Sequence, residues 1–344
     1  MSTPSPSSTW PSGPNGPFSA FVVERRDGGL DAGVRELTVD DLGPGEVTIR
    51  IEWSAVNYKD GMTTQPGNRV ARISPLIPGV DLVGTVLDSA DPDFSPGQAV
   101  IAHSYDLGVA HHGGFAELAR VPSSWVVALP PGLDTKEAAT IGTAGFTAAL
   151  SLHRLQAFGL EAGDGPVLVT GATGGVGSMA VSLLAAKGYE VVASTGKASA
   201  GDYLVGLGAS DIITRDELLA DPGRTLAKER WAGAIDCVGG TTLASILRSL
   251  RYGAAVAASG LTGGSGLETT VFPFITRNVS LIGIDTVQTP IDERRHVWGE
   301  EMADAWSKPL LARMVESEIG LAELRPALDR ILQGGVRGRV LVRP

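Results

Sequence analysis

The stretch PVLVTGATGGVGSMAVSLLAAKGYEVVASTGK, residues 166–197, decides the fold. A short β-branched strand at 167–170 runs into a glycine turn. The residues after the turn carry apolar side chains at helical spacing, and a second apolar strand follows at 191–193. This order of strand, turn, helix and strand is what a dinucleotide needs. The glycines let the backbone approach a pyrophosphate, and the helix start offers free N–H groups.

The glycine motif departs from the Gly-x-Gly-x-x-Gly pattern at its first position. It reads Ala172-x-Gly174-x-x-Gly177. The motif alone is weakly specific, so the prediction depends on the strand before it and the helix after it. The alternative is a structural glycine turn in another α/β fold.

The end of the second strand indicates which nicotinamide cofactor binds. About 20 residues after the glycine motif, an acidic residue would hold a ribose 2′-hydroxyl and repel a 2′-phosphate. This chain instead has Ser194, Thr195, Gly196 and Lys197, and Arg215 follows the next predicted strand. Hydroxyls and cations favour a phosphate, so we expect NADPH rather than NADH. The alternatives are a solvated Lys197 and a surface ion pair of Arg215 with its acidic neighbours.

Composition limits the class of protein. The 344 residues are enough for two domains, and the net charge of −10 without a basic cluster argues against nucleic acid or an anionic membrane as main partner. The one cysteine, Cys237, excludes a disulfide within the chain and fits a reducing cytoplasm; we expect it to be a small buried residue.

Residues 1–17 are rich in Ser, Pro and Gly and are interpreted as a disordered extension, not a secretory signal. No stretch is long and apolar enough to span a membrane.

The patterns along the chain predict an α/β protein with a small twisted barrel followed by a doubly wound parallel sheet. A helix-like, alanine-rich segment at 135–156 joins the two, and residues 338–342 form a closing strand. The candidate strands of the barrel are 18–24, 46–56, 84–87, 99–101 and 125–129. Those of the parallel sheet are 167–170, 190–193, 211–214, 234–238, 254–258 and 279–284.

Several strings together resemble the medium-chain dehydrogenase/reductase superfamily and, within its quinone-oxidoreductase-like group, the acrylyl-CoA reductase branch. The resemblance covers residues 18–344. The strings are VNYKD at 56–60, PGVDLVGTV at 78–86, GTAGFTA at 142–148, the glycine turn at 170–177, WAGAID at 231–236, GLTGG at 260–264, FPFITRNV at 272–279, GID at 283–285 and RGRV at 337–340.

This resemblance implies a GroES-like β-barrel catalytic domain, residues 18–140 and 286–344, and a Rossmann NADPH-binding domain, residues 141–285. It implies NADPH-dependent reduction of the C=C bond of a short 2-enoyl-CoA, above all acryloyl-CoA to propanoyl-CoA, by a homodimer. Two alternatives stay open, namely a reductase of quinones, enones or enals and a non-catalytic NADPH-binding protein.

We expect no metal. Zinc alcohol dehydrogenases of the superfamily use a catalytic Cys and a Gly-His-Glu string, where this chain has PGVD at 78–81. A structural zinc site would need several cysteines, and only one exists. His111 and His112 lie in a predicted loop, where a metal patch is one reading and a solvated or substrate-lining loop the other.

The resemblance places Tyr58 at the nicotinamide end of the cleft, as a cofactor contact and catalytic candidate. Asn57 and Asp60 share its loop as further catalytic candidates, and the alternative for Asp60 is a charge pair with Lys59. The expected cofactor contacts are Tyr58, Gly174, Gly175, Val176, Gly177, Ser178, Ser194, Thr195, Gly196, Lys197, Arg215, Gly260, Leu261, Ile284 with Asp285, and Arg339. Candidates for the phosphates of coenzyme A, all in predicted loops, are Arg69, Arg72, Arg294 and Arg295.

Overall fold

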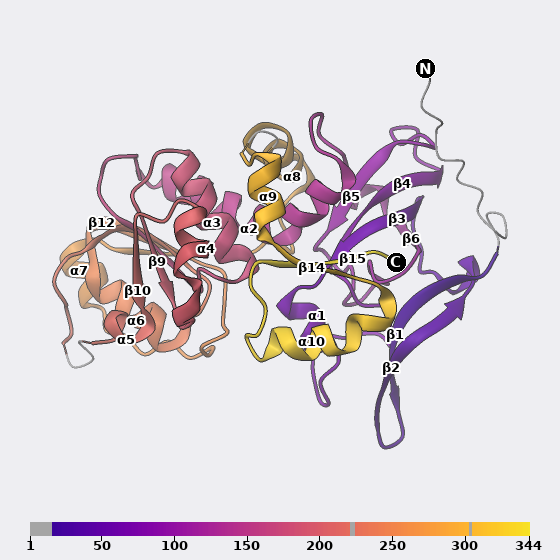
Figure 1. The fold of residues 1–344 in the computed structure, drawn as a ribbon, viewed down its shortest axis with the longest axis horizontal. Helices are drawn as coiled ribbons and strands as arrows, with labels where there is room; N and C mark the ends of the chain where they lie inside the picture. The colour runs from indigo at the N-terminus through magenta and orange to yellow at the C-terminus, as the bar shows by residue number, and fades with distance from the viewer. Residues whose placement is uncertain (1–15, 221–223, 303–304) are drawn as a thin grey trace.

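The computed structural model describes residues 16–220, 224–302 and 305–344. The chain forms two lobes side by side, with a parallel sheet and its helices in one and antiparallel strands in the other (Figure 1). The C-terminus lies in the antiparallel lobe. This confirms the predicted α/β class. The expected disordered extension at 1–17 falls almost wholly outside the described residues.

The first lobe is a six-stranded sheet in the order β10-β9-β8-β11-β12-β13, and every neighbouring pair is parallel. Its strands are β8 (Val167–Thr170), β9 (Val191–Thr195), β10 (Asp211–Thr214), β11 (Trp231–Asp236), β12 (Leu250–Ala258) and β13 (Ser280–Gly283). All six were predicted from their apolar runs. In such a sheet ligands bind beyond the carboxyl ends of the strands, where the strand order reverses.

The second lobe holds a seven-stranded sheet, in which β6 branches off by pairing with β3, and an N-terminal hairpin. Its strands are β1 (Phe18–Arg26), β2 (Gly29–Leu37), β3 (Val47–Ala55), β4 (Asp81–Ser89), β5 (Ala99–His103), β6 (Leu118–Val121), β7 (Val126–Ala128), β14 (Val315–Ile319) and β15 (Arg339–Val342). The patterns missed β2, β6 and β14. No residue of β2 or β14 is fully buried, so the apolar alternation that marks a strand is weak there.

A long helix, α2 (Thr135–Ala157), lies between the lobes, and one hydrophobic core extends from barrel strands across it to the parallel sheet. The boundary expected between residues 140 and 141 falls inside this helix, next to Gly142, whose dihedral angles (φ 47°, ψ −154°) break the helical path. The other α-helices are α1 (Tyr58–Thr63), α3 (Gly175–Ala186), α4 (Gly201–Gly206), α5 (Arg215–Leu218), α6 (Gly240–Ser249), α7 (Phe272–Arg277), α8 (Ile291–His296), α9 (Lys308–Met314) and α10 (Leu324–Leu332). A π-helical segment spans Val297–Met302, and 3₁₀ turns span Val39–Asp41, Ser123–Trp125, Ala198–Ala200 and Leu321–Glu323.

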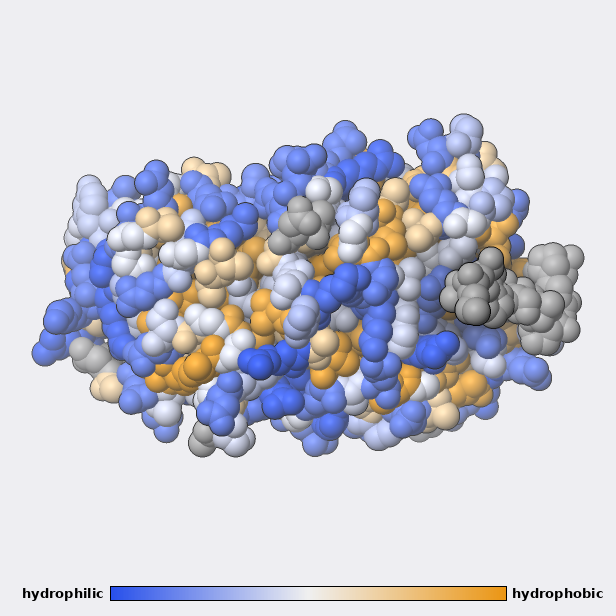
Figure 2. Space-filling model, turned by 45° about the horizontal axis from the view of Figure 1, so that its top comes forward, coloured by the Kyte–Doolittle hydropathy of each residue, from blue (hydrophilic) through white to orange (hydrophobic). Residues whose placement is uncertain are grey.

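The surface is mainly hydrophilic, with hydrophobic side chains in smaller groups on the face that Figure 2 shows. Within the described ranges, the helices are too short or too polar to cross a membrane.

Candidate functional site

The glycine turn between β8 and α3 forms one wall of the site. Gly171 has a left-handed backbone (φ 59°), and a Cβ on Gly177 would lie 2.3 Å from the Gly171 carbonyl oxygen. The turn can therefore close only with glycine at position 177. The first bond of the helix runs from the Ser178 amide to the Gly174 carbonyl (2.9 Å), which leaves the preceding amides of Gly175, Val176 and Gly177 outside the helical pattern. Such amides fit a pyrophosphate.

Ser178 supports this turn from behind. Its amide donates to the Gly174 carbonyl oxygen, and its hydroxyl donates to the Ala172 carbonyl oxygen (3.2 Å). The Tyr203 hydroxyl of α4 donates to the same Ser178 oxygen (2.9 Å). Ser178 is fully buried, so its atoms stabilise the turn rather than face the cleft.

Two cations, Lys197 and Arg215, lie next to Gly196 at the carboxyl end of β9. The Lys197 ammonium donates to the Val336 carbonyl oxygen (2.7 Å), and partial burial lowers the pKa of Lys197. A Cβ on Gly196 would lie 3.3 Å from Nη2 of Arg215, so that guanidinium lies against the strand end. Arg215 forms no ion pair with Asp216 or Glu217 in the described part of the chain. No contact among the described residues therefore supports the alternative that Arg215 forms a surface ion pair with its acidic neighbours.

A buried ion pair forms the opposite wall. Asp81 and Arg339 are 1–2% exposed, and their side chains meet at 3.1 Å. The other partners of the Asp81 carboxylate are Asn57 Nδ2 (2.8 Å), the Thr143 hydroxyl (2.7 Å) and the Thr143 amide (2.8 Å). Arg339 also donates to Asn57 Oδ1 (3.0 Å), and its Nη1 would lie 3.1 Å from a Cβ on Gly175. The guanidinium thus joins the barrel to the start of α3.

The loop with Tyr58 begins α1, with Asn57 as its N-cap residue. Tyr58 is half-buried, and its hydroxyl has no hydrogen-bond partner in the described chain. Asp60 is fully buried and accepts the amides of Asn57 (2.8 Å), Gly79 (3.2 Å) and Val80 (3.0 Å). Burial raises the pKa of Asp60 to about 7. Because its partners are backbone amides, the expected alternative of a Lys59–Asp60 charge pair finds no contact among the described residues.

A second buried cluster, which the sequence did not indicate, lies behind Asp81. The Trp298 indole donates to His103 Nε2 (2.9 Å), and Arg294 Nη1 lies 2.9 Å from His103 Nδ1. Burial, and then the Arg294 charge, hold the pKa of His103 well below its usual value, so the ring is neutral at pH 7. His103 Nδ1 also lies 3.4 Å from the Thr143 hydroxyl, which contacts Asp81.

The prediction that Arg294 and Arg295 lie in loops is wrong, since both belong to α8. Arg294 is fully buried, and its guanidinium donates to the Thr286 carbonyl oxygen (2.9 Å), so it is closed to a coenzyme A phosphate. Arg295 lies near Asp292 (4.0 Å). Arg69 and Arg72 lie between α1 and β4, as expected of loop residues, and Arg72 pairs with Asp106 (3.2 Å).

Gly260 and Leu261 follow β12, and Ile284 and Asp285 follow β13, so all four lie at the carboxyl edge of the sheet. A Cβ on Gly260 would lie 2.0 Å from the Cys237 carbonyl oxygen, which requires glycine. Ile284 and Asp285 line a cavity of about 260 Å³.

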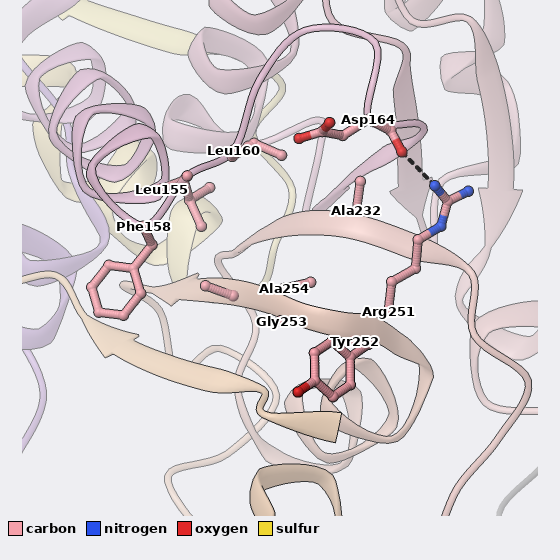
Figure 3. Close-up of a pocket in the computed structure, with 11 residues that line it drawn as sticks. Leu155, Phe158, Leu160, Asp164, Ala232, Arg251, Tyr252, Gly253 and Ala254 are labelled. Carbon is pink, nitrogen blue, oxygen red and sulfur yellow. Dashed lines mark hydrogen bonds between the residues drawn. The ribbon is translucent and has the colours of Figure 1, made fainter. Parts of the chain in front are cut away.

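Another pocket, of about 340 Å³, lies at the amino ends of β11 and β12, between the end of α2 and residues 251–255 (Figure 3). In that view the Arg251 guanidinium donates to the backbone carbonyl oxygen of Asp164, while Phe158 and Tyr252 lie at the pocket's margin. Since dinucleotides bind beyond the carboxyl ends of the strands, this pocket is separate from the predicted cofactor site.

Cys237 directly follows β11, and burial raises the pKa of its thiol to about 12, so the thiol is a poor nucleophile. His111 bonds the Pro44 carbonyl oxygen (2.8 Å), and His112 Nδ1 accepts the Ile77 amide (3.1 Å). The described residues contain no group of three or more His, Cys, Asp or Glu able to hold a metal. The metal-free interpretation stays a prediction.

Comparisons with known proteins agree with this architecture. Residues 43–131 match the alcohol dehydrogenase GroES-like domain, and residues 175–304 match the zinc-binding dehydrogenase family. The chain is 48% identical to the putative quinone oxidoreductase YhfP of Bacillus subtilis, over 95% of this chain and 98% of that protein. It is 46% identical to the acrylyl-CoA reductase AcuI of Ruegeria pomeroyi, over 94% and 98%.

Two crystal structures are similar over nearly the whole chain. One is the yhdH oxidoreductase of Salmonella enterica in complex with NADP (TM-score 0.91, 45% identity, 95% of this chain and 99% of that one). The other is yhfP of Bacillus subtilis with NAD bound (TM-score 0.92, 48% identity, 96% and 100%).

A GroES-like barrel joined to a Rossmann sheet defines an oxidoreductase that uses a nicotinamide cofactor. The chain belongs to the medium-chain dehydrogenase/reductase superfamily, among relatives named quinone oxidoreductase and acrylyl-CoA reductase.

Sequence reasoning gave no role to Asp81, Thr143 and His103, although the first two lie within strings quoted for the resemblance. A carboxylate three residues before the predicted strand at 84–87 was the available signal for Asp81. Nothing local indicated that Arg339, far along the chain, would pair with it.

Proposed function

We propose that the protein is an NADPH-dependent, zinc-independent reductase of the C=C bond of a short 2-enoyl-CoA, with acryloyl-CoA reduced to propanoyl-CoA. The observation that carries the cofactor choice is the pair of cations, Lys197 and Arg215, at the end of β9, where an acidic residue would favour NADH. The substrate is proposed from the 46% identity to the acrylyl-CoA reductase.

The residues at this edge fit the parts of NADPH. The amides of Gly175, Val176 and Gly177 would receive the pyrophosphate, with Arg339 beside them. Ser194, Thr195, Lys197 and Arg215 would surround the 2′-phosphate. Gly260, Leu261, Ile284 and Tyr58 would border the nicotinamide. One relative was crystallised with NADP and another with NAD, so the preference between the cofactors needs its own test.

When bound, the cofactor supplies a hydride to the β-carbon of the alkene. The residues must then stabilise negative charge on the thioester oxygen and allow a proton to reach the α-carbon. Tyr58 has the one hydroxyl of its loop without a partner in the described chain, and it is our candidate donor. Both hydrogens of the Asn57 amide are used, by Ala55 (3.1 Å) and Asp81 (2.8 Å), so Asn57 acts as a positioning residue.

Asp60 is also proposed as a positioning residue, because its carboxylate fixes the start of α1 against the segment before β4. The α-carbon proton would come from Tyr58 or from solvent.

The test is a steady-state comparison of acryloyl-CoA, a quinone and a free enal with NADPH. We expect kcat/KM to be highest for acryloyl-CoA. A value no better than that for the quinone rejects the narrower function and favours the second candidate, a quinone or enone reductase. The 48% identity to a putative quinone oxidoreductase supports that candidate. Absence of NADPH oxidation across the panel would favour a non-catalytic binding protein.

Chelation gives an independent test of the metal-free interpretation. We expect activity to be unchanged after prolonged dialysis against a strong zinc chelator, because the residues at the position of the zinc motif are engaged by Arg339 and Asn57. Inactivation that added zinc reverses would contradict the proposal.

We further propose a homodimer in the cytoplasm. Apolar side chains are exposed on the edge strand β13, on α7 and on the loop before it; they are Leu261, Leu267, Val271, Phe272, Ile275 and Leu281. A second copy of this surface would cover them. Light scattering should give twice the chain mass, and Ile275→Asp should shift it to the monomer mass. A monomeric wild-type protein would reject the dimer.

A further inference from the structure

A segment of the barrel lobe reaches across to the glycine turn. After α10 the chain passes beside the Rossmann lobe before it returns as β15 (Figure 1). The Gly338 amide donates to the Thr173 carbonyl oxygen (2.8 Å), inside the glycine turn. A Cβ on Gly338 would lie 2.8 Å from the Tyr203 hydroxyl, and its φ of 65° also requires glycine. The crossing segment is therefore held closely at this position.

The same segment presents the guanidinium of Arg337 on the outside of this contact. The group lies over the Tyr203 ring, 4.8 Å from its centroid, and the residue is exposed. Its backbone amide donates to one oxygen of the Glu316 carboxylate (3.1 Å). The other oxygen of that carboxylate accepts from the Arg330 guanidinium (2.7 Å). In the described chain the Arg337 guanidinium itself has no ion pair. It is a positioned cation without a counter-ion.

Arg337 belongs to the same electrostatic environment as Lys197. The Lys197 ammonium bonds the carbonyl oxygen of Val336, the residue directly before Arg337. Burial is the main cause that lowers the pKa of Lys197; among the neighbouring charges Glu316 acts most strongly and raises it, whereas Arg337 and Arg330 lower it. Arg215 lies against Gly196, the residue directly before Lys197. In a chain of net charge −10, Lys197, Arg215 and Arg337 thus gather around one strand end, and none of the three forms an ion pair with another described residue.

We propose that Arg337 is a specificity-determining residue that the barrel lobe contributes to recognition of the cofactor's 2′-phosphate. This inference rests on the proposed use of NADPH. A phosphate at the end of β9 would have Lys197 and Arg215 from the Rossmann lobe and Arg337 from the barrel lobe. Its charge would offset the repulsion among the three. NADH has only a hydroxyl at this position and gains nothing from Arg337.

The experiment is a fluorescence titration of the full-length protein with NADPH and with NADH. The variants are Arg337→Met, Arg337→Lys and a matched control, Arg325→Met, which removes an exposed arginine of α10 that pairs with Asp329 (3.3 Å). We expect Arg337→Met to weaken NADPH binding by about tenfold, the loss of one charge-assisted contact, and to leave NADH binding unchanged. Arg337→Lys should recover part of the loss, and Arg325→Met should match the wild type.

Equal weakening for both cofactors, or no change in NADPH affinity, would overturn the role of Arg337. These outcomes are separate from failure of the proposed function. That failure would appear in the wild-type protein as absent NADPH binding or as a preference for NADH.

Discussion

The two ends of the proposed cofactor cleft are built differently. The core of the phosphate end comes from one continuous stretch, in which β8, the glycine turn, α3 and β9 follow one another between residues 167 and 195, and Arg215 and Arg337 join it from later segments. The other end, which we call the nicotinamide end, is the wall of Tyr58, Asp81 and Arg339; it joins distant parts of the chain, because the Arg339–Asp81 pair spans 258 residues and the Thr143–Asp81 bond spans 62. A local pattern specifies the first end, and only the complete fold assembles the second.

The two ends also differ in what holds them. The phosphate end consists of backbone amides and of cations that are exposed or half-buried, so we expect changes there to act mainly on binding. At the nicotinamide end, Asp81 and Arg339 are buried and satisfy each other, so changes there act mainly on folding. Variants at each end should separate these two effects.

The largest effect is expected from Asp81→Ala. It leaves the Arg339 guanidinium buried without its carboxylate, which costs about 3–5 kcal/mol of the free energy of unfolding. Urea unfolding followed by tryptophan fluorescence measures this loss. The control is Asp329→Ala, which breaks the half-exposed pair with Arg325 and should cost less than about 1 kcal/mol. Equal losses in the two variants would show that the buried Asp81–Arg339 pair matters no more for stability than the half-exposed Asp329–Arg325 pair.

At the other end, Gly177→Ala should act on binding. Its Cβ would lie 2.3 Å from the Gly171 carbonyl oxygen, so the turn must open. Overpacking costs about 1–3 kcal/mol, and we expect cofactor affinity to fall about a hundredfold in a titration. Gly201→Ala is the matched control, because a Cβ there meets nothing within 4 Å and the backbone is helical (φ −53°). Unchanged affinity of Gly177→Ala would contradict the assignment of this turn to the pyrophosphate.

A smaller and more selective effect is expected from Lys197→Asp. Loss of a charge-assisted contact costs about 1.5–3 kcal/mol, which weakens NADPH binding roughly ten- to a hundredfold and leaves NADH binding almost unchanged. Lys187→Asp makes the same charge change at the far end of α3 and should have no effect. The assignment is rejected if both cofactors are weakened equally.

The contrast between the ends explains how far the sequence could be interpreted. The six parallel strands and the glycine turn were predicted because buried apolar runs and glycine spacing are local signals. Strands β2 and β14 were not predicted, because their residues are not fully buried and lack clear apolar alternation.

For the site, the sequence indicated Lys197 and Arg215 from their place after strands, and Tyr58 and Arg339 through the family resemblance. It could not indicate the contacts of Arg294 with His103, because these residues meet across 191 positions of the chain. It also placed Arg294 in a loop as a phosphate ligand, whereas the fold buries it in α8. Charge alone does not distinguish an arginine that faces solvent from one that holds a core together.

The last prediction uses His103 to show that the nicotinamide end depends on pH through folding. Burial and the Arg294 charge keep the folded-state pKa of His103 well below its unfolded value of about 6.5. The unfolded chain therefore binds a proton below pH 6.5 that the folded chain excludes, so stability is full above this pH and declines as pH falls. Between pH 7 and pH 5 the wild type should lose about 2 kcal/mol more than His103→Gln, measured by urea unfolding.

Glutamine keeps an acceptor for the Trp298 indole, so this variant tests titration rather than packing. The raised pKa of Asp60 acts in the opposite direction, since its contribution to stability declines as pH rises toward about 7. That contribution is the same in both proteins and cancels in the difference. If the free energy of unfolding responds equally to pH in the two proteins, the fold does not require a neutral His103. The contrast in what holds the two ends would then fail for this residue.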